Sequence, residues 1–230
     1  MTVNRVLDLF GQTQIFGSVD RDRLIPLAEL ANRRFYIRGE SIFHQGDPGE
    51  ALFLIESGIV KIDLTSDDGD QMVLATLGPG ETFGELALID RGPRSASARA
   101  VESCCLLALP REAFLHAVRE NPLLLESLLE SLGTLLRSLL AQASDLVFLD
   151  LASRVAKQLM TLAEKNGRPD NGGITLDLHL SQSGLAGMVG GSRPSVNQIL
   201  KSFEARGYLE VKGRRIFIKH PELLRRRAHQ

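Results

Sequence analysis

Side chains that can hydrogen-bond to nucleic acid bases recur at helical spacing near the C-terminus. In residues 193–206, apolar side chains occupy every third or fourth position. The face between them carries Arg193, Asn197 or Gln198, and Lys201. Arginine suits guanine and glutamine suits adenine in the major groove, while serine and lysine suit phosphates. The spacing therefore predicts a helix whose exposed face contacts double-stranded DNA.

A shorter helix and a turn precede this helix, and a hairpin follows it. Residues 182–189 have helical character. Gly190 and Gly191 supply a turn, and Ser192 can cap the next helix. Two helices joined by a glycine turn form a helix-turn-helix, whose second helix enters the major groove. Residues 208–218 predict a wing with a basic tip; the alternative is an ordinary helix pair. The residues predicted to contact DNA are Ser181, Gln182, Ser192, Arg193, Ser195, Asn197, Gln198, Lys201, Lys212 and Arg214.

Charge is divided unevenly along the chain. The net charge is −1, but residues 151–230 contain 14 Lys and Arg against 6 Asp and Glu, a net of +8, which leaves −9 for residues 1–150. Lysine and arginine gain affinity for a polyanion by releasing the counterions of its phosphates. The division favours DNA as the partner of the C-terminal part. The alternative is chance clustering of solvated charge.

Residues 33–109 are typical of short antiparallel strands. Apolar or alternating runs, such as residues 51–55, are separated by turns rich in Gly, Asp and Pro. This pattern predicts an antiparallel roll or sandwich, preceded by a small helical segment within residues 6–34. Cys104 and Cys105 are adjacent in an apolar run, so both are expected to be buried in a strand. Their spacing fits no zinc or iron–sulfur pattern, and no metal site is predicted.

A leucine-rich stretch that begins at Pro122 predicts one long helix. Its leucines follow a three/four spacing, and further leucines widen the apolar face. A helix of roughly 25 residues, or about 37 Å, could cover the β domain with one side and pair with its twin through the other. The alternative is a helix buried in the core of a single chain.

A second helix is predicted over residues 151–164. Asp150 is a plausible N-cap for it. A polar loop is expected at residues 165–173, and the domain boundary is placed near residues 148–151.

Three segments of the chain together resemble one protein family. Residues 83–96, FGELALIDRGPRSA, resemble the phosphate-binding cassette of cyclic-nucleotide-binding domains. Residues 145–150 and the helix-turn-helix add to this likeness. From about Phe10 to Leu224 the chain resembles the CRP/FNR family, and specifically its cyclic AMP receptor protein branch. The resemblance implies an α+β fold with an N-terminal antiparallel β-roll (the cyclic-nucleotide-binding jelly roll), a long dimerisation helix and a C-terminal winged helix-turn-helix. The implied domains are 1–120 for the β-roll effector domain, 121–149 for the dimerisation helix and hinge, and 150–230 for the DNA-binding domain.

The resemblance also implies an effector pocket. A cyclic nucleotide offers an anionic phosphate and a ribose 2′-hydroxyl. Arg94 can donate a bidentate pair of hydrogen bonds to the phosphate, and the Ser95 hydroxyl can donate another. Glu85 can accept a hydrogen bond from the 2′-hydroxyl. A short helix that opens at Gly84 points N–H groups at the anion. The alternative is that Glu85 and Arg94 form only a structural salt bridge in a pocket that has lost its ligand. The predicted ligand-binding residues are Ile62, Leu74, Gly84, Glu85, Leu86, Arg94, Ser95, Ala96, Leu139 and Leu140.

Two departures from the family bear on specificity. The family offers adjacent hydroxyl residues of the long helix to the purine edge, but Leu139 and Leu140 stand there, and leucine cannot hydrogen-bond a base. Cyclic AMP and cyclic GMP both remain expected effectors. The alternative is a vestigial or differently liganded pocket, in a constitutive or cyclic di-GMP-responsive regulator. In the recognition helix, Arg193 matches an arginine that contacts bases in the family. Pro194 and Gln198 stand where the family has two further base-contacting residues, an acidic one and an arginine. The preferred DNA sequence should therefore differ from that of the cyclic AMP receptor protein branch.

These observations predict a ligand-responsive transcription regulator that binds a pseudo-palindromic operator as a homodimer. RNA polymerase is a further expected partner, through residues 165–173. A module that gates a kinase, an acyltransferase or a channel would carry a catalytic domain or a membrane span, and the sequence has neither. No nucleophile–base pair or metal-ligand cluster stands out, so no catalytic residue, enzyme activity or cofactor is predicted. The N-terminus lacks a signal-peptide layout, and the cytoplasm is the expected location.

Overall fold

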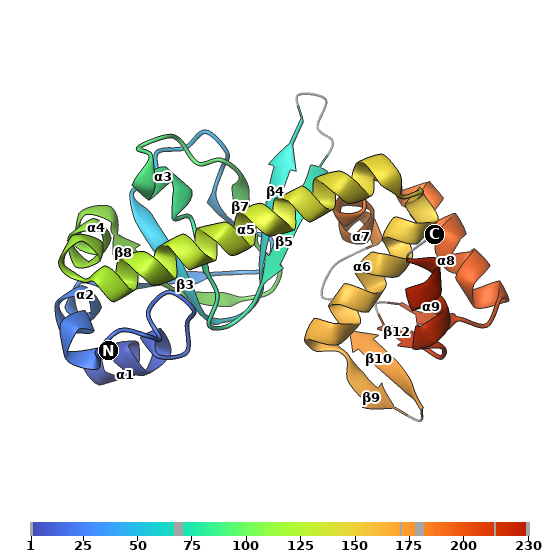
Figure 1. The fold of residues 1–230 in the computed structure, drawn as a ribbon, viewed down its shortest axis with the longest axis horizontal. Helices are drawn as coiled ribbons and strands as arrows, with labels where there is room; N and C mark the ends of the chain where they lie inside the picture. The colour runs from blue at the N-terminus through green and yellow to red at the C-terminus, as the bar shows by residue number, and fades with distance from the viewer. Residues whose placement is uncertain (1, 67–70, 171, 178–181, 214, 229–230) are drawn as a thin grey trace. The chain divides into compact units, whose positions relative to one another are not determined.

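The chain divides into two compact units, each with its own core. The computed structural model describes residues 2–66, 71–170, 172–177, 182–213 and 215–228. The first unit comprises Met1–Asp70 and Leu74–Arg137, and the second comprises Gln71–Val73 and Ser138–Gln230. Figure 1 shows both units, with labels on many of their helices and strands. Antiparallel sheets combined with helices confirm the predicted α+β fold class.

The predicted β-roll is confirmed as two four-stranded sheets. Their strand orders are β1-β8-β3-β6 and β2-β7-β4-β5. The pairings of β8 with β1 and β3, and of β7 with β2 and β4, are antiparallel. Apolar side chains from both sheets pack between them, which makes the roll a closed, two-layered body. The strands are β1 (Asn32–Tyr36), β2 (Ser41–Phe43), β3 (Ala51–Ser57), β4 (Val60–Thr65), β5 (Gln71–Leu77), β6 (Thr82–Phe83), β7 (Ser97–Ala100) and β8 (Cys104–Pro110).

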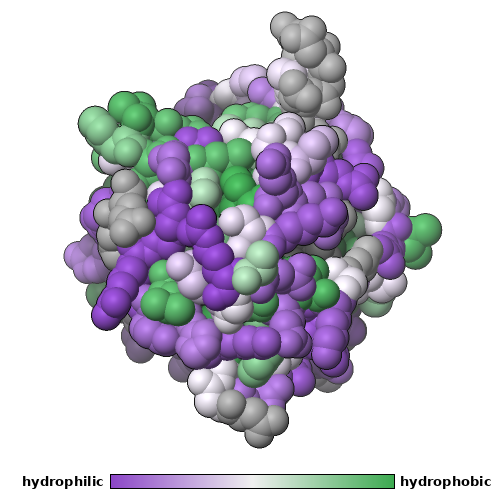
Figure 2. Space-filling view, turned by 90° about the vertical axis from the view of Figure 1, so that its right-hand side faces the viewer, coloured by the Kyte–Doolittle hydropathy of each residue, from purple (hydrophilic) through white to green (hydrophobic). Residues whose placement is uncertain are grey.

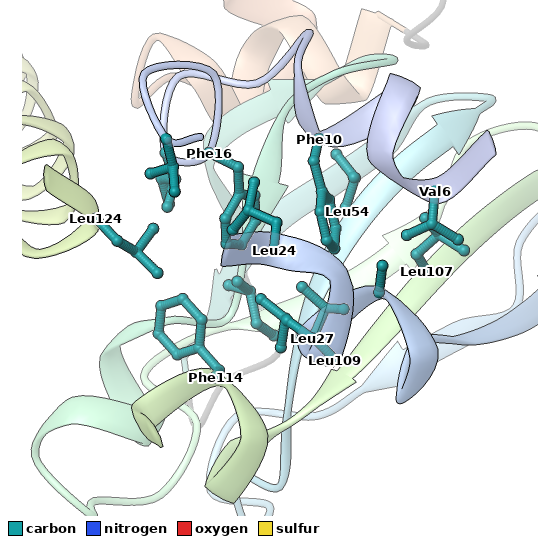
Figure 3. Packing of buried hydrophobic residues seen from close by; sticks show 14 of the residues in the cluster. Val6, Phe10, Phe16, Leu24, Leu27, Leu54, Leu107, Leu109, Phe114 and Leu124 are labelled. Carbon is teal, nitrogen blue, oxygen red and sulfur yellow. The ribbon is translucent and has the colours of Figure 1, made fainter. Parts of the chain in front are cut away.

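Helices close one side of the roll around an aromatic cluster. The rings of Phe10 and Phe16 lie 4.6 Å apart, and Phe114 meets Phe16 edge-on at 6.2 Å. Figure 3 shows these rings with Leu54 and Leu109 of the sheet and Leu124 of the long helix. This packing fixes the start of the long helix on the roll. The helices are α1 (Val3–Phe10), the 3-10 helix η1 (Arg21–Leu24), α2 (Ile25–Glu29), α3 (Leu86–Ile89), α4 (Arg111–Glu120) and α5 (Pro122–Phe148).

The long helix α5 buries only part of its leucine surface. Leu124 and Leu128 are buried near its N-terminal end. The helix is therefore not a fully buried core helix, and it keeps an unpartnered apolar side within one chain. Among the described residues, no helix is long and apolar enough to cross a membrane. The large apolar side chains of α5 that stay exposed are Leu123, Leu125, Leu129, Leu136, Leu139, Leu140, Leu146, Val147 and Phe148.

Both cysteines are buried and unpaired in β8, as the sequence predicted. They point to opposite sides of the strand, as neighbours in a strand do. The Cys105 thiol donates to Glu56 Oε2 at 3.1 Å, and burial raises its pKa to about 11. A thiol with so high a pKa stays protonated at neutral pH and is a poor metal ligand or nucleophile.

The second unit packs helices on a small antiparallel sheet of order β11-β12-β10-β9. Asp150 is the N-cap of its first helix, as predicted, because its side chain accepts from the Ser153 N–H at 2.7 Å. A C-terminal helix after the wing, α9, had no counterpart among the sequence predictions. The elements are α6 (Leu151–Asn166), β9 (Arg168–Asp170), β10 (Gly173–Asp177), α7 (Gln182–Met188), α8 (Arg193–Ala205), β11 (Leu209–Lys212), β12 (Arg215–Ile218) and α9 (Pro221–Arg227).

The prediction of a polar loop over residues 165–173 is wrong. The helix α6 continues to Asn166, and β9 then pairs with β10 in a hairpin. Gly172 has a φ of +83°, which allows the tight turn. The side chains of β9 are all exposed, so no apolar alternation revealed the strand. Backbone pairing holds it in place, together with a hydrogen bond of 3.0 Å from Thr175 Oγ1 to Asp170 Oδ2.

Candidate effector pocket and nucleic-acid interface

The centre of the cassette is a buried arginine. Arg94 is only 4% exposed. Its Nη1 donates to the Gly84 carbonyl at 2.7 Å and its Nη2 donates to the Ala51 carbonyl at 2.8 Å. The guanidinium also lies 4.2 Å above the ring of Phe43, where the negative face of the aromatic ring attracts it. The roll therefore contains a fixed cation whose position is set from β2, β3 and the end of β6.

Gly84 has to be a glycine for this arrangement to form. Its φ is +87°, in the left-handed region, and a Cβ there would approach Arg94 Nη1 to 2.6 Å. The backbone can therefore turn from β6 into α3 and bring a carbonyl to the guanidinium. The sequence predicted Gly84 as a pocket residue, and this geometry gives the reason.

The remaining nitrogen of the guanidinium lacks a partner. Arg94 Nε is buried and makes no hydrogen bond to any described residue. Burial lowers the pKa of Arg94, while Glu85, Asp47 and Glu50 oppose that shift, and an arginine stays charged in any case. A buried unpaired donor costs roughly 1–3 kcal/mol. An anion such as a phosphate has the charge and the acceptor oxygens that this cation needs.

Glu85 stands at the start of α3, next to this cation. Burial raises the pKa of Glu85 above its usual range, although a hydrogen bond within its own residue and the charge of Arg94 oppose the shift. The two side chains form no direct ion pair, since Arg94 donates to main-chain carbonyls. The alternative of a structural salt bridge therefore does not describe this pair. The Glu85 carboxyl accepts a hydrogen bond from its own main-chain N–H, and a carboxylate has further acceptor positions for a hydroxyl donor.

The other predicted pocket residues are spread over several elements. Ser95 is exposed directly after Arg94, and Ala96 is buried. Ile62 and Leu74 are half-buried, on β4 and β5. The cassette residues and Ile62 thus lie in the first unit. Leu86 is half-buried in α3, and Leu139 and Leu140 are exposed on the part of α5 that belongs to the second unit.

Sequence reasoning missed a residue that holds the cassette helix. Arg111, at the start of α4, donates from Nε and Nη2 to the Leu88 carbonyl at 3.1 and 2.9 Å. The two bonds fix the last turn of α3 from outside the cassette. Nothing in the local sequence signals this contact, because the partners are far apart along the chain and one of them is a main-chain group.

The predicted helix-turn-helix is present as α7 and α8. Gly190 has a φ of +61°, and a Cβ on it would approach a methyl group of Leu146 to 2.8 Å. Ser192 caps α8 by accepting from the Ser195 N–H at 3.2 Å. Val196 and Leu200 are buried against the core of the second unit. The turn, the cap and the buried side of the second helix therefore match the sequence prediction.

The outer side of α8 carries the predicted base-reading groups. Arg193, Gln198 and Lys201 are exposed. Asn197 is half-buried and its Oδ1 is buried without a partner, so Gln198 is the better placed of the two amides. The face of the molecule in Figure 2, which looks onto the end where α8 lies, is mostly hydrophilic. Exposed cations and amides on a helix-turn-helix fit a polyanionic groove.

Four further predicted contacts lie before α8 and in the wing. Lys212 is exposed at the end of β11, with its Nζ 3.7 Å from Glu210 Oε2. Gln182 is half-buried at the start of α7. Ser181 and Arg214 lie outside the described residues.

The junction between α5 and α6 is held by an arginine that the sequence analysis did not single out. Arg154 donates from Nε to the Val189 carbonyl at 2.8 Å and from Nη1 to the Leu149 carbonyl at 3.0 Å. One side chain thus joins the end of α5 to the helix-turn-helix turn. Lys157 adds an ion pair of 2.7 Å with Asp145 across the same junction. The junction is therefore a defined structure and not a free linker.

Comparisons with known proteins agree with both parts of the chain. Residues 33–121 match the model of the cyclic nucleotide-binding domain, and residues 153–227 match that of the Crp-like helix-turn-helix domain. The chain is 34% identical over 221 residues to the CRP-like cAMP-activated global transcriptional regulator of Mycobacterium tuberculosis, covering 96% of this chain and 99% of the relative. It is 37% identical over 192 residues to the cyclic AMP receptor protein of Thermus thermophilus, covering 84% and 86%.

A solved structure with the same fold has a different effector in its description. The c-di-GMP responsive global regulator CLP of Xanthomonas campestris superposes with a TM-score of 0.77 at 28% identity, covering 86% of this chain and 99% of that one. The fold is thus shared by regulators described with cAMP and with c-di-GMP.

The raised pKa of Glu85 predicts a pH-dependent stability difference. The folded chain binds the Glu85 proton more tightly than the unfolded chain, so the stability from this group is present at low pH and is lost as the pH rises through the raised pKa. Glu85→Gln removes this loss. The free energy of unfolding of the variant, relative to the parent chain, should therefore increase as the pH rises above the ordinary glutamate pKa of about 4.

Urea denaturation at several pH values measures this difference. Glu120→Gln, at an exposed position of α4, is the control and should follow the parent chain throughout. Parallel pH curves for Glu85→Gln and the parent chain would contradict the raised pKa.

Proposed function

The chain belongs to the CRP/FNR family of DNA-binding transcription regulators, and we propose that a cyclic nucleotide bound in the β-roll controls its binding to DNA. The observation that carries this proposal is the buried cation of Arg94. Its Nε makes no hydrogen bond to any described residue, and the half-buried Glu85 is near enough for the charge of Arg94 to act on its carboxyl. A fixed cation next to a hydroxyl acceptor is what a nucleotide with one phosphate charge and a ribose hydroxyl requires.

Each part of the nucleotide has a proposed partner. The phosphate would bind at Arg94 and Ser95, with main-chain N–H groups of the segment from Gly84 to Leu86 as further donors. The ribose 2′-hydroxyl would donate to Glu85. Ile62 and Leu74, half-buried on their strands, would contact the ribose and base, with Ala96 close behind the phosphate.

At the positions where the family resemblance implies hydroxyl groups for the base, α5 carries exposed leucines. Leu139 is 39% exposed and Leu140 is 61% exposed. An apolar surface accepts either purine and reads neither edge by hydrogen bonds, so discrimination between cyclic AMP and cyclic GMP would be weak. The relatives named as cAMP-activated favour cyclic AMP as the first ligand to test.

Calorimetric titration with cyclic AMP, cyclic GMP and cyclic di-GMP distinguishes the possible effectors. The structural likeness to CLP makes cyclic di-GMP a specific second candidate. Binding of cyclic di-GMP alone would replace the proposed effector. No binding of any of the three would indicate a constitutive regulator.

We further propose a homodimer that pairs through α5. Seven residues of this helix alternate at spacings of four and three, the pattern of a two-stranded coiled coil. A twofold pair of chains would place two copies of α8 about 34 Å apart, one turn of DNA, on a pseudo-palindromic operator. The seam residues are Leu125, Leu129, Leu132, Leu136, Leu139, Ala143 and Leu146.

The remaining assignments follow from this function. We place the regulator in the cytoplasm, where its DNA is. The exposed hairpin of β9 and β10, with Arg168 and Asp170 on its surface, is the proposed contact for RNA polymerase.

A charge on the seam should separate the dimer. In Leu136→Glu the carboxylate of each chain would face the apolar seam and the same charge of its partner, so the variant should be monomeric at micromolar concentration. Light scattering after size-exclusion chromatography measures the mass. Ser144→Glu, an exposed position beside the seam, is the matched control and should remain dimeric. A dimeric Leu136→Glu chain would place the interface elsewhere.

Loss of the buried cation should abolish the response to nucleotide. Arg94→Leu removes the proposed phosphate partner, so cyclic AMP should no longer increase the affinity for DNA. Fluorescence anisotropy with a labelled operator duplex, with and without cyclic AMP, measures this effect. Circular dichroism checks the fold, and Arg119→Leu on the exposed side of α4 is the control. An unchanged nucleotide response in a folded Arg94→Leu chain would refute the proposed pocket.

The recognition helix should read DNA through Arg193. Arg193→Ala should weaken binding to the preferred operator by about 1–3 kcal/mol and relax the preference at one base pair of each half-site. Selection from random DNA gives the operator, and titration of single-base variants measures the preference. Arg206→Ala, an exposed arginine after the last turn of α8, should weaken binding evenly across sequences.

A further inference from the structure

The last helix of the chain returns from the wing to the start of α6. The wing strand β12 ends at Ile218, and α9 begins at Pro221. Leu224 is fully buried and Ala228 is 6% exposed, so α9 is anchored in the core of the second unit. This packing brings Arg227 to the residues that join α5 and α6.

Arg227 binds the residue that caps α6. Its Nη2 donates to Asp150 Oδ2 at 2.6 Å, and its Nη1 donates to Ser153 Oγ. The other carboxylate oxygen, Asp150 Oδ1, accepts from the N–H and from the Oγ of Ser153, both at 2.7 Å. One carboxylate thus holds the first turn of α6 with one oxygen and the end of α9 with the other.

The side chain of Arg227 is placed for this contact and not for solvent. It is 19% exposed, whereas that of Arg225 on the same helix is 56% exposed. The hydrogen bonds from Ser153 and Arg227 lower the pKa of Asp150 to about 2, so the carboxylate stays ionised in the neutral pH range. The contact is therefore a charge-assisted hydrogen bond at neutral pH.

Asp150 lies at the point where α5 ends and α6 begins. Arg154, one turn into α6, holds the Leu149 carbonyl at the end of α5 and the Val189 carbonyl before the glycine turn. Arg227, on the helix that follows the wing, is bound to the same turn of α6 through Asp150. The end of α5, the helix-turn-helix turn and the helix that follows the wing are therefore all hydrogen-bonded to the first turn of α6.

We propose that Arg227 is a positioning residue that couples the effector response to DNA binding, by holding the first turn of α6 to the helix behind the wing. The proposal rests on the proposed function, since it concerns how a change in α5 reaches the DNA-binding surface. With Arg227 in place, the first turn of α6 and the wing move together. Without it, a movement of α5 is absorbed by loosening of the α6 cap.

This role differs from a simple contribution to stability. The carboxylate of Asp150 is 62% exposed. Exposed ion pairs add little to the free energy of unfolding. The loss of Arg227 should therefore appear in the coupling between ligands more than in the melting temperature.

The test compares Arg227→Gln with Arg226→Gln in the full chain. Arg226 is exposed on the same helix, so the control removes the same charge from the same part of the DNA-binding unit. Affinity for the selected operator is measured with and without saturating cyclic AMP, and the affinity for cyclic AMP is measured without DNA. We expect the cyclic AMP-induced gain in DNA affinity to fall at least about fivefold in Arg227→Gln, within the usual range of allosteric coupling.

Two further results are expected with this loss. Affinity for cyclic AMP without DNA should be unchanged, because the pocket is not altered. Arg226→Gln should keep the gain of the parent chain. A gain in Arg227→Gln within twofold of the parent chain would overturn the proposal, whether or not its melting temperature falls.

Hydrogen exchange separates failure of this inference from failure of the proposed function. If the parent chain shows no response to cyclic AMP, the proposed function fails, and the positioning role is then judged from the main-chain amide of Ser153, which donates to Asp150 Oδ1. The amide proton of Ser153 should exchange several-fold faster in Arg227→Gln than in Arg226→Gln. Equal exchange rates in the two variants would overturn the positioning role.

Discussion

The burial of one positive charge constrains the whole cassette. A guanidinium removed from water is tolerated only where hydrogen-bond acceptors and polarisable groups replace the solvent. The carbonyls of Gly84 and Ala51 and the ring of Phe43 replace it around Arg94. The left-handed turn at Gly84 is part of this arrangement, because a Cβ at this position would approach Arg94 Nη1 to 2.6 Å. Within the described residues Arg94 Nε has no hydrogen-bond partner, and the half-buried Glu85 stands beside it; these are the two groups on which the proposed nucleotide site depends.

The long helix α5 is the structural element shared by both units. Its first turns are fixed in the core through Leu124 and Leu128, while leucines further along, such as Leu136 and Leu140, stay exposed. Covering a leucine side chain contributes about 1.5–3 kcal/mol. A second copy of α5 would cover this surface, and the four/three spacing would make the contact regular. The exposed apolar surface proposed for pairing therefore lies on the helix that runs from the first unit into the second.

The DNA-binding unit is organised around main-chain carbonyls at helix ends. Arg154 donates hydrogen bonds to carbonyls at the end of α5 and before the turn that leads to α8. Asp150 accepts from a main-chain N–H in the first turn of α6. These contacts use charged side chains at the junction, while Arg193, Gln198 and Lys201 stay exposed on α8. The positive charge of this half of the sequence thus serves two purposes: some cations hold the junction, and others face the nucleic acid.

The sequence by itself determined the elements whose signals are local. Glycine turns, caps at Asp150 and Ser192, alternating strands and the leucine period of α5 each depend on neighbouring residues, and all of them appear in the structure. Residues 165–173 and α9 were not predicted correctly, because exposed polar strands and short helices carry no apolar period. Only the tertiary structure decided that Arg94 is held by carbonyls and not by Glu85, that Arg111 holds α3, and that Arg227 reaches Asp150. Such contacts join groups distant in sequence, often through the main chain, and a main-chain carbonyl has no residue type by which a sequence could reveal it.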